Sequence, residues 1–319
     1  MLKRIKGEKF MSERKITIGS DPEYFIRNKT NGQLVSAIPF IKGDKQNPSI
    51  LPSGGNIQSD NVAVEFATVP AKSTADFIAN LKTTLTETMQ ALPDGHELAV
   101  LPSANFHPME LIDPKAQEFG CDPDFDAWEL KENDSPVGPD PTFRSCGGHI
   151  HVGCLNVDGT PTHPDAQFLL DEMGKIMMVR GMDTFHGIIS TILDNSPAAI
   201  ERRKLYGKAG SHRYPDYGIE YRTLSNYWTK SPMLSMLMSS LVDVVVDLII
   251  DGKLEDIIEE IGAEDIQRII NTGNVVDAKS TLNKVLINYL NEDSKFFLEE
   301  CLAKLGKEDS LEKAWEIGS

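Results

Sequence analysis

The segment Gly147–Gly153 holds two histidines at strand spacing within the run Gly-Gly-His-Ile-His-Val-Gly. Side chains of a strand alternate between two faces, so His149 and His151 share one face and the apolar residues share the other. Glycines on both sides leave room beside the two imidazoles. This pattern favours a metal or phosphate site, and a pair of solvated histidines at a sheet edge is the alternative.

Three further segments place charged side chains on strands in the same way. Asp21 and Glu23 follow an alternating run of isoleucines, Glu65 lies opposite the apolar residues of its strand, and Glu220 shares a face with Arg222. Each segment alone is consistent with the solvent face of a half-exposed antiparallel sheet. Charges on buried strands are costly unless they are paired or bind metal. Together the segments predict one sheet face that converges on a site.

The residue types at this predicted site favour a hard cation. Up to four acids accompany the two imidazoles. Ligand sets dominated by Asp and Glu suit Mg²⁺ or Mn²⁺, whereas sets dominated by His with a single carboxylate suit Zn²⁺. We therefore expect Mg²⁺, with Mn²⁺ as the second choice.

A basic segment at residues 201–213 carries five Lys or Arg residues and one Glu. We expect it to be a loop. Guanidinium groups bind phosphate oxygens in pairs, so this loop is interpreted as a triphosphate clamp just before the strand with Glu220. The alternative is a solvated loop that balances nearby acids.

The composition indicates an ordinary globular protein, with 319 residues, 40% hydrophobic and 25% charged. A net charge of −16 argues against broad binding to nucleic acid or to an anionic membrane. The four cysteines show no CxxC spacing, so we expect thiols in a reducing compartment and a cytoplasmic location. The apolar stretch Met233–Ile250 is interrupted by serines and aspartates and predicts a buried helix rather than a membrane span.

Several elements must position these residues. Residues 1–13 predict a disordered leader, and residues 14–70 predict strands with a hairpin at an Asn-Gly turn. Ser73 is expected to cap a helix to about Ala91, and residues 165–194 are expected to be mostly helical. The Pro-, Asp- and Gly-rich residues 113–144 predict a long loop that folds over the site.

The ordered set of motifs resembles the phage-type carboxylate–amine ligases (COOH–NH2 ligases, or amidoligases) of the glutamine synthetase and glutamate–cysteine ligase superfamily. The resemblance extends over about residues 15–230, and the remaining residues carry no matching motif. The motifs are Gly19–Glu23, Asn61–Phe66, Gly120–Phe125, Phe143–Gly153 and Gly218–Arg222.

The resemblance implies an α+β fold with a curved antiparallel sheet of the glutamine synthetase-like catalytic type and helices outside it. Residues 14–230 would form the catalytic domain and residues 231–319 a C-terminal helical region. The implied activity is the ATP- and Mg²⁺-dependent joining of a carboxylate to an amine through an acyl phosphate. The substrates would be small molecules or peptides, and the chain could form a homo-oligomer, in the host cytoplasm if a phage encodes it.

The resemblance also assigns roles to residues of this sequence. The implied metal ligands are Asp21, Glu23, Glu65, His149 and Glu220. The implied residues at the transferred phosphate are Arg213, Arg222 and Arg203, with Arg202, Lys208 and His151 at the nucleotide. The expected substrate contacts are Arg144 and Asp124, and Asp60 or Asp124 is a candidate base.

Two other functions fit the same residues. A hydrolase could hold Zn²⁺ at the His-x-His motif and an acid, and would need neither ATP nor the basic loop. A non-catalytic phage virion or scaffold protein could retain an old ligase fold and use its acidic helical C-terminal region as a contact surface.

Overall fold

A large antiparallel sheet carries the charged motifs in the computed structural model, which describes residues 13–117, 124–134, 140–156, 158–307 and 309–318. In spatial order its strands are β3 (Ser49–Ile50), β4 (Asn56–Asp60), β5 (Ala63–Ala67), β1 (Thr17–Asn28), β11 (Gly148–Gly153), β13 (Gly218–Tyr221), β12 (Ser211–Arg213), β8 (Phe125–Asp126) and β9 (Lys131–Glu132). Two further strands, β2 (Leu34–Val35) and β6 (His96–Ala99), also pair with β1, and β7 (Ser103–Asn105) pairs separately with β10 (Phe143–Ser145).

The long strand β1 organises the sheet. Residues 17–22 pair with β11, residues 23–24 with β5, and residues 25–28 with β6. The predicted hairpin joins β1 to β2, and Gly32 supplies the positive φ of 73° that its turn requires. The strand β1 therefore lies beside β11, which carries His149, and beside β5, which carries Glu65.

Alternation separates the apolar and charged faces of the central strands. Ile18, Val64, Ile150 and Tyr221 come from four neighbouring strands and lie in one hydrophobic core. Residues one position away along each strand face the opposite side. The core therefore lies behind the sheet, and the charged motifs lie in front of it.

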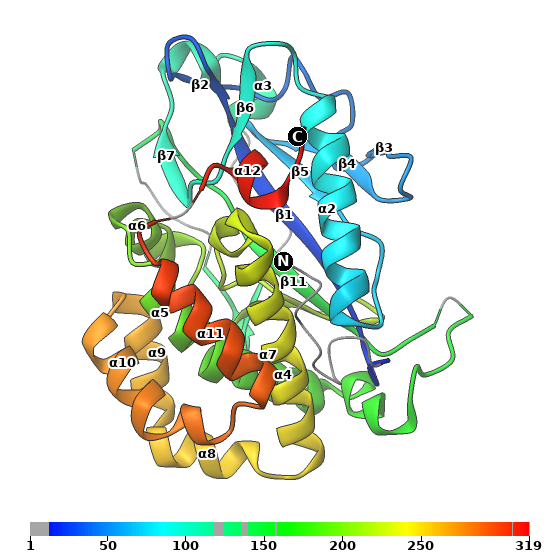
Figure 1. Cartoon of the computed structure of the whole chain (residues 1–319), viewed down its shortest axis with the longest axis vertical. Coiled ribbons are helices and arrows are strands. Elements are labelled where there is room, and N and C mark those ends of the chain that lie inside the picture. The colour runs from blue at the N-terminus through cyan, green and yellow to red at the C-terminus, as the bar shows by residue number, and fades with distance from the viewer. Residues whose placement is uncertain (1–12, 118–123, 135–139, 157, 308, 319) are drawn as a thin grey trace.

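Most helices pack on the apolar face of the sheet (Figure 1). The helices among the described residues are α2 (Thr74–Gln90), α3 (Pro114–Gln117), α4 (Glu172–Met182), α5 (Ile188–Leu193), α6 (Pro197–Leu205), α7 (Pro232–Ile250), α8 (Leu254–Ile261), α9 (Ala263–Thr272), α10 (Val275–Lys284), α11 (Glu292–Lys304) and α12 (Leu311–Trp315). The short helix α3 is an exception, because its Ala116 lies in a second hydrophobic cluster with Phe25 and Ala63. A wide helical turn, Asp183–Gly187, joins α4 to α5, and short 3-10 turns lie at Pro108–Leu111, Pro164–Leu170, Asn226–Lys230 and Leu286–Asn288.

The helix caps follow the sequence signals. Ser73 caps α2 as predicted, and its hydroxyl accepts a hydrogen bond from the Asp76 backbone N–H at 3.0 Å. Near the other end of the chain, α12 (red in Figure 1) lies close to the end of β1, where Glu312 pairs with Lys29 at 3.8 Å. There the indole N–H of Trp315 donates to the Thr229 carbonyl at 2.7 Å.

Helix α7 is a core helix, as predicted. It is the one helix in the described part of the chain that is long and apolar enough to cross a membrane, with a mean hydropathy of 2.1. However, 78% of its most apolar window is buried inside the protein. Arg14 pairs with Asp243 of this helix at 2.8 Å and neutralises its charge.

The α+β prediction, with an antiparallel sheet and a helical C-terminal region, is confirmed. Two local predictions are wrong in part. Residues 201–205 belong to α6 and residues 211–213 to β12 rather than to a loop, and residues 113–144 contain α3, β8, β9 and the start of β10 rather than only irregular chain. Residues 1–12, 118–123 and 135–139 of the predicted leader and loop lie outside the described residues.

The predicted domain boundary at residue 230 stays a prediction. Apolar side chains of α7 and α11 share one hydrophobic core with the sheet strands, including Leu241, Val245 and Phe297. The sheet and these two helices therefore depend on one another for their burial.

Candidate functional site

The register of the sheet brings the charged residues of β1, β11, β13 and β12 together. Asp21 lies opposite His149, and His151 lies opposite Glu220. Glu220 in turn lies opposite Arg213. Residues that are far apart in the sequence thus form a continuous band across four adjacent strands.

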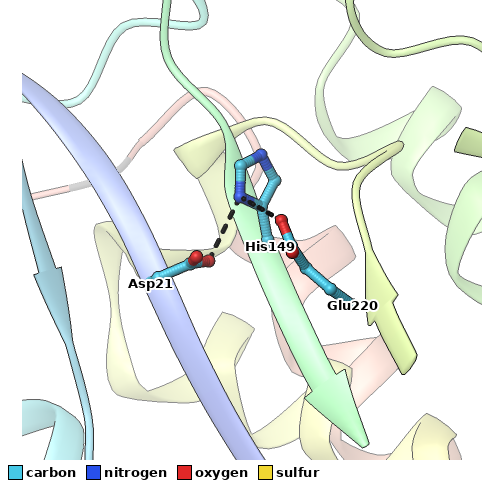
Figure 2. Close-up of side chains that lie close together, drawn as sticks. All are labelled: Asp21, His149 and Glu220. Atoms are coloured by element: carbon cyan, nitrogen blue, oxygen red, sulfur yellow. Dashed lines mark ion pairs between the residues drawn. The ribbon is translucent and has the colours of Figure 1, made fainter. Parts of the chain in front are cut away.

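The side chains of Asp21, His149 and Glu220 converge from three adjacent strands (Figure 2). The Nδ1 atom of His149 lies 3.1 Å from Oδ1 of Asp21 and 3.5 Å from Oε1 of Glu220. His149 is 4% exposed and Glu220 is 7% exposed. We call this group the first cluster.

The chemistry of the first cluster fits a divalent cation. Oδ1 of Asp21 and Nδ1 of His149 are buried, and neither has a hydrogen-bond partner among the described residues. Buried polar atoms are normally hydrogen-bonded, because burial without a partner is costly. Two carboxylates and an imidazole that point their lone pairs at one another suit a metal ion.

Two guanidinium groups adjoin the first cluster. Arg222 contacts the carboxylate of Glu220, and its Nε atom lies 3.5 Å from Oδ2 of Asp124. Nη1 of Arg213 lies 3.6 Å from Oε1 of Glu220. These side chains place positive charge next to the carboxylates on the β12 and β13 side of the cluster.

The second cluster consists of Glu23, Asp60 and Glu65, whose candidate ligand atoms lie within 4.8 Å of one another. Glu23 accepts a hydrogen bond from the backbone N–H of Gly147 at 2.5 Å, and Glu65 accepts one from Gln58 at 2.8 Å. All three acids therefore lie on the same face as the first cluster, towards β4 and β5.

Electrostatics distinguishes the two clusters. Burial, together with the charges of Asp21, Asp60 and Glu23, raises the pKa of Glu65 well above its usual range. Burial also raises the pKa of Glu23, although the charge of His149 opposes this. Mutual repulsion of carboxylates marks the second cluster as a site that a cation would stabilise.

In the first cluster, neighbouring positive charges outweigh burial and lower the pKa of both carboxylates. Burial acts to raise the pKa of Asp21, but the charges of His151 and His149 outweigh it and lower that pKa below its ordinary value. Burial and the charge of Asp21 act to raise the pKa of Glu220, yet Arg222 and the histidines bring it below its ordinary value. These carboxylates therefore favour the charged form that binds metal.

Arg202 and Arg203 lie on α6 and are buried. Arg202 donates to the backbone carbonyl of Thr223 at 2.8 Å and to that of Arg222 at 3.2 Å, and burial lowers its pKa to about 10. Arg203 donates to the carbonyl of Asp194 at 2.9 Å. Arg202 thus stabilises the chain that follows β13, and Arg203 does not belong to either cluster.

Arg144 is also held away from the two clusters. Its guanidinium donates to the backbone carbonyls of Ala116 at 2.6 Å and Pro141 at 2.9 Å, and to the side chain of Asn61 at 2.8 Å. Lys208 lies exposed on the turn between α6 and β12. The expected substrate and nucleotide roles of Arg144 and Lys208 stay predictions.

From the sequence alone, Asp60 is not predicted among the acids of a metal site, and Tyr217 is not predicted at this face at all. Asp60 was expected only as a candidate base, but it joins the second cluster because β4 pairs with β5 and places Asp60 opposite Ala63. Tyr217 lies in the turn between β12 and β13, and its hydroxyl contacts Nδ1 of His151. Neither position carries a local motif, so only strand pairing could reveal them.

Residues 168–260 match the family model described as "Phage phiEco32-like COOH.NH2 ligase-type 2". Over these residues, the resemblance to the carboxylate–amine ligases is confirmed. The matched segment contains Arg213, Glu220 and Arg222 and crosses the predicted boundary at residue 230, whereas the motifs of β1, β5 and β11 precede it. No curated protein sequence matches the chain.

Several solved structures are similar to the chain at low identity. A bifunctional glutathione synthetase from Pasteurella multocida has a TM-score of 0.49 at 12% identity, with 94% of this chain and 48% of that chain covered. A GmaS/ADP complex has a TM-score of 0.45 at 13% identity, with 91% of this chain and 69% of that chain covered. GmaS without ligand has a TM-score of 0.48 at 11% identity, with coverages of 91% and 68%. The chain thus spans about half the length of the glutathione synthetase, at 48% of it.

Proposed function

We propose that this protein is an ATP- and Mg²⁺-dependent ligase that joins a carboxylate to an amine through an acyl phosphate. The observation that carries the proposal is the gathering of two acidic clusters and two guanidinium groups on one sheet face. Carboxylate-rich clusters suit Mg²⁺, and Mg²⁺ in proteins commonly works on phosphates. The family match over residues 168–260 supports the same ligase class.

The two clusters would each hold a cation. Asp21, His149 and Glu220 would hold one of them, and the second cluster would hold the other through three carboxylates. Bound Mg²⁺ supplies charge that neutralises the ATP phosphates during phosphoryl transfer. Mn²⁺ accepts the same ligands and is a practical substitute.

Arg213 and Arg222 would bind the oxygens of the transferred phosphate. Both guanidiniums contact Glu220, so each lies within reach of a phosphate that bridges to the first cluster. The γ-phosphoryl group moves from ATP to a substrate carboxylate oxygen, which yields ADP and an acyl phosphate. The amine then attacks the acyl carbon, the phosphate leaves, and the guanidiniums stabilise the oxyanion.

Asp124 is the preferred candidate to accept the amine proton. Its carboxylate lies 3.5 Å from Arg222 at the edge of the first cluster, and its side chain is 20% exposed. Asp60, the other candidate, is engaged with Glu23 and Glu65. The substrates would be a small or peptide carboxylate and an amine, and the setting would be cytoplasmic, with homo-oligomer formation as a further proposal.

A screen for ADP release tests this function. Amino acids, peptides and amines are supplied in pairs with ATP and Mg²⁺, and release is expected only when a suitable acid is present. Glu220→Gln should abolish release, since Glu220 belongs to the first cluster. Glu255→Gln, an exposed change on α8, should not.

Two outcomes would contradict the proposal. Turnover that needs no ATP, with one zinc ion bound per chain, would favour a hydrolase. A protein whose unfolding temperature does not respond to ATP with Mg²⁺ would favour a non-catalytic role. In both clusters, however, carboxylates outnumber imidazoles, which favours Mg²⁺ over zinc.

A further inference from the structure

Tyr217 occupies a fixed position beside the first cluster. Its backbone carbonyl accepts a hydrogen bond from the Cys154 N–H at 2.8 Å. The next residue, Gly218, pairs with Gly153, and a Cβ at Gly218 would lie only 2.0 Å from the Val152 carbonyl oxygen. A glycine is therefore required here, and the main chain holds Tyr217 on both sides.

The ring of Tyr217 lies where β11 lacks a side chain. A Cβ at Gly153 would lie 2.6 Å from Oγ1 of Thr17 and 3.4 Å from Cδ2 of Tyr217, so the ring packs beside this glycine. Gly153 and His151 share one strand face. The ring centroids of Tyr217 and His151 are 6.0 Å apart, and the phenolic oxygen contacts Nδ1 of the imidazole.

The other edge of the same imidazole meets the first cluster. Nε2 of His151 lies 3.1 Å from Oδ1 of Asp21, the same carboxylate oxygen that lies 3.1 Å from Nδ1 of His149. The hydroxyl of Tyr217 and the carboxylate of Asp21 thus contact the two nitrogens of one imidazole, from its opposite edges.

We propose that Tyr217 is a positioning residue that acts on the first cluster through His151. Its hydroxyl sets the orientation of the imidazole, and the imidazole keeps the carboxylate of Asp21 directed towards His149 and Glu220. Partners that orient metal ligands in this way commonly set metal affinity. This inference rests on the proposed function, because it requires the first cluster to bind a cation.

Binding of Mn²⁺ alone, followed by electron paramagnetic resonance of the free ion, tests the inference. The wild-type protein is compared with Glu220→Gln, and the class of Mn²⁺ sites that this substitution removes is the one followed in the other variants. Tyr217→Phe should weaken that class about tenfold, the lower end of the effect of losing such a partner. His151→Gln should weaken it at least as much, and the double variant should bind no more weakly than His151→Gln alone.

Tyr214→Phe is the matched control, because Tyr214 lies in the same turn but packs on Phe125, with the ring centroids 5.1 Å apart, rather than on His151. It should bind Mn²⁺ like the wild-type protein. Wild-type affinity for Mn²⁺ in Tyr217→Phe would overturn the inference and leave the proposed function standing. The same holds if the double variant loses affinity by the product of the two single-variant factors, because the two residues would then act independently. If Tyr217→Phe does not fold, unchanged affinity in His151→Gln would overturn the inference. A wild-type protein that binds no Mn²⁺ would overturn both proposals.

Discussion

Replacing Asp183 by Asn should change the pH dependence of stability. Asp183 is fully buried in the wide turn between α4 and α5. Its carboxyl group accepts hydrogen bonds from the Trp128 indole at 2.6 Å, the Gly210 N–H at 2.5 Å and the Tyr221 hydroxyl at 2.7 Å. It thereby ties the helices to the strands that carry Glu220.

The magnitude follows from the pKa of this carboxyl group. Burial raises the pKa of Asp183 from its ordinary value of 3.8 to about 7. Because the pKa in the folded state lies above that in the unfolded state, the folded protein holds a proton that the unfolded chain loses. The resulting stabilisation is full below the unfolded pKa and disappears as the pH rises through the folded one. It amounts to about 4 kcal/mol in total, and about 2 kcal/mol of it is lost between about pH 5 and about pH 6.5.

Urea unfolding of the wild-type protein and Asp183→Asn at these two pH values measures the effect. The difference in free energy of unfolding, wild type minus variant, should be smaller at the higher pH by about 2 kcal/mol. Asp158→Asn removes an exposed carboxyl group and should give the same difference at both pH values. A difference for Asp183→Asn that is constant, or that grows with pH, would refute the reasoning.

Three further changes have defined outcomes. Gly147→Ala should weaken Mn²⁺ binding about tenfold or more, because its Cβ would lie 2.2 Å from Nε2 of His149 and displace the imidazole. Arg14→Met should lower the free energy of unfolding by about 3 kcal/mol, because it leaves Asp243 without its partner at 2.8 Å. Ser73→Ala should cost about 1 kcal/mol in urea unfolding, since it removes the cap of α2.

Each of these predictions has its own control or contrary result. Gly19→Ala, whose Cβ would meet the nearest atom at 3.8 Å, should bind Mn²⁺ normally, so equal losses in the two glycine variants would argue against displacement of the imidazole. An unchanged stability in Arg14→Met would mean that Asp243 needs no partner. For Ser73→Ala, the same loss in Ser73→Asp, which keeps a capping oxygen, would show that the hydroxyl does not act as a cap.

The sequence predicts the strands of the site well, because alternation is a local property. His149 and His151 flank a buried isoleucine, and Glu65 lies between a buried valine and a buried phenylalanine. The charged face can therefore be inferred without knowing which strands pair. Strand pairing is not local. Asp60 and Tyr217 reach the site only through the neighbours that the sheet gives them.

The basic segment shows a different failure. Ser196 and Pro197 form a helix-start signal, with a capping hydroxyl that accepts from the Ala199 N–H at 3.2 Å. The positive charge of residues 201–213 predicted a loop that clamps a triphosphate instead. Charge alone does not reveal that Arg202 and Arg203 satisfy backbone carbonyls inside the protein. The predicted loop is therefore wrong over residues 201–205, which belong to α6, and the phosphate contacts of Arg202 and Arg203 stay predictions.

Counting the Mn²⁺ ions that the protein binds tests most directly whether one sheet face holds divalent cations. The two clusters predict two ions per wild-type chain, and the loss of one ion in Glu220→Gln and of the other in Glu65→Gln. Both variants should remain folded by circular dichroism. A wild-type chain that binds no ion, or variants that bind as many ions as wild type with the same affinity, would contradict the account.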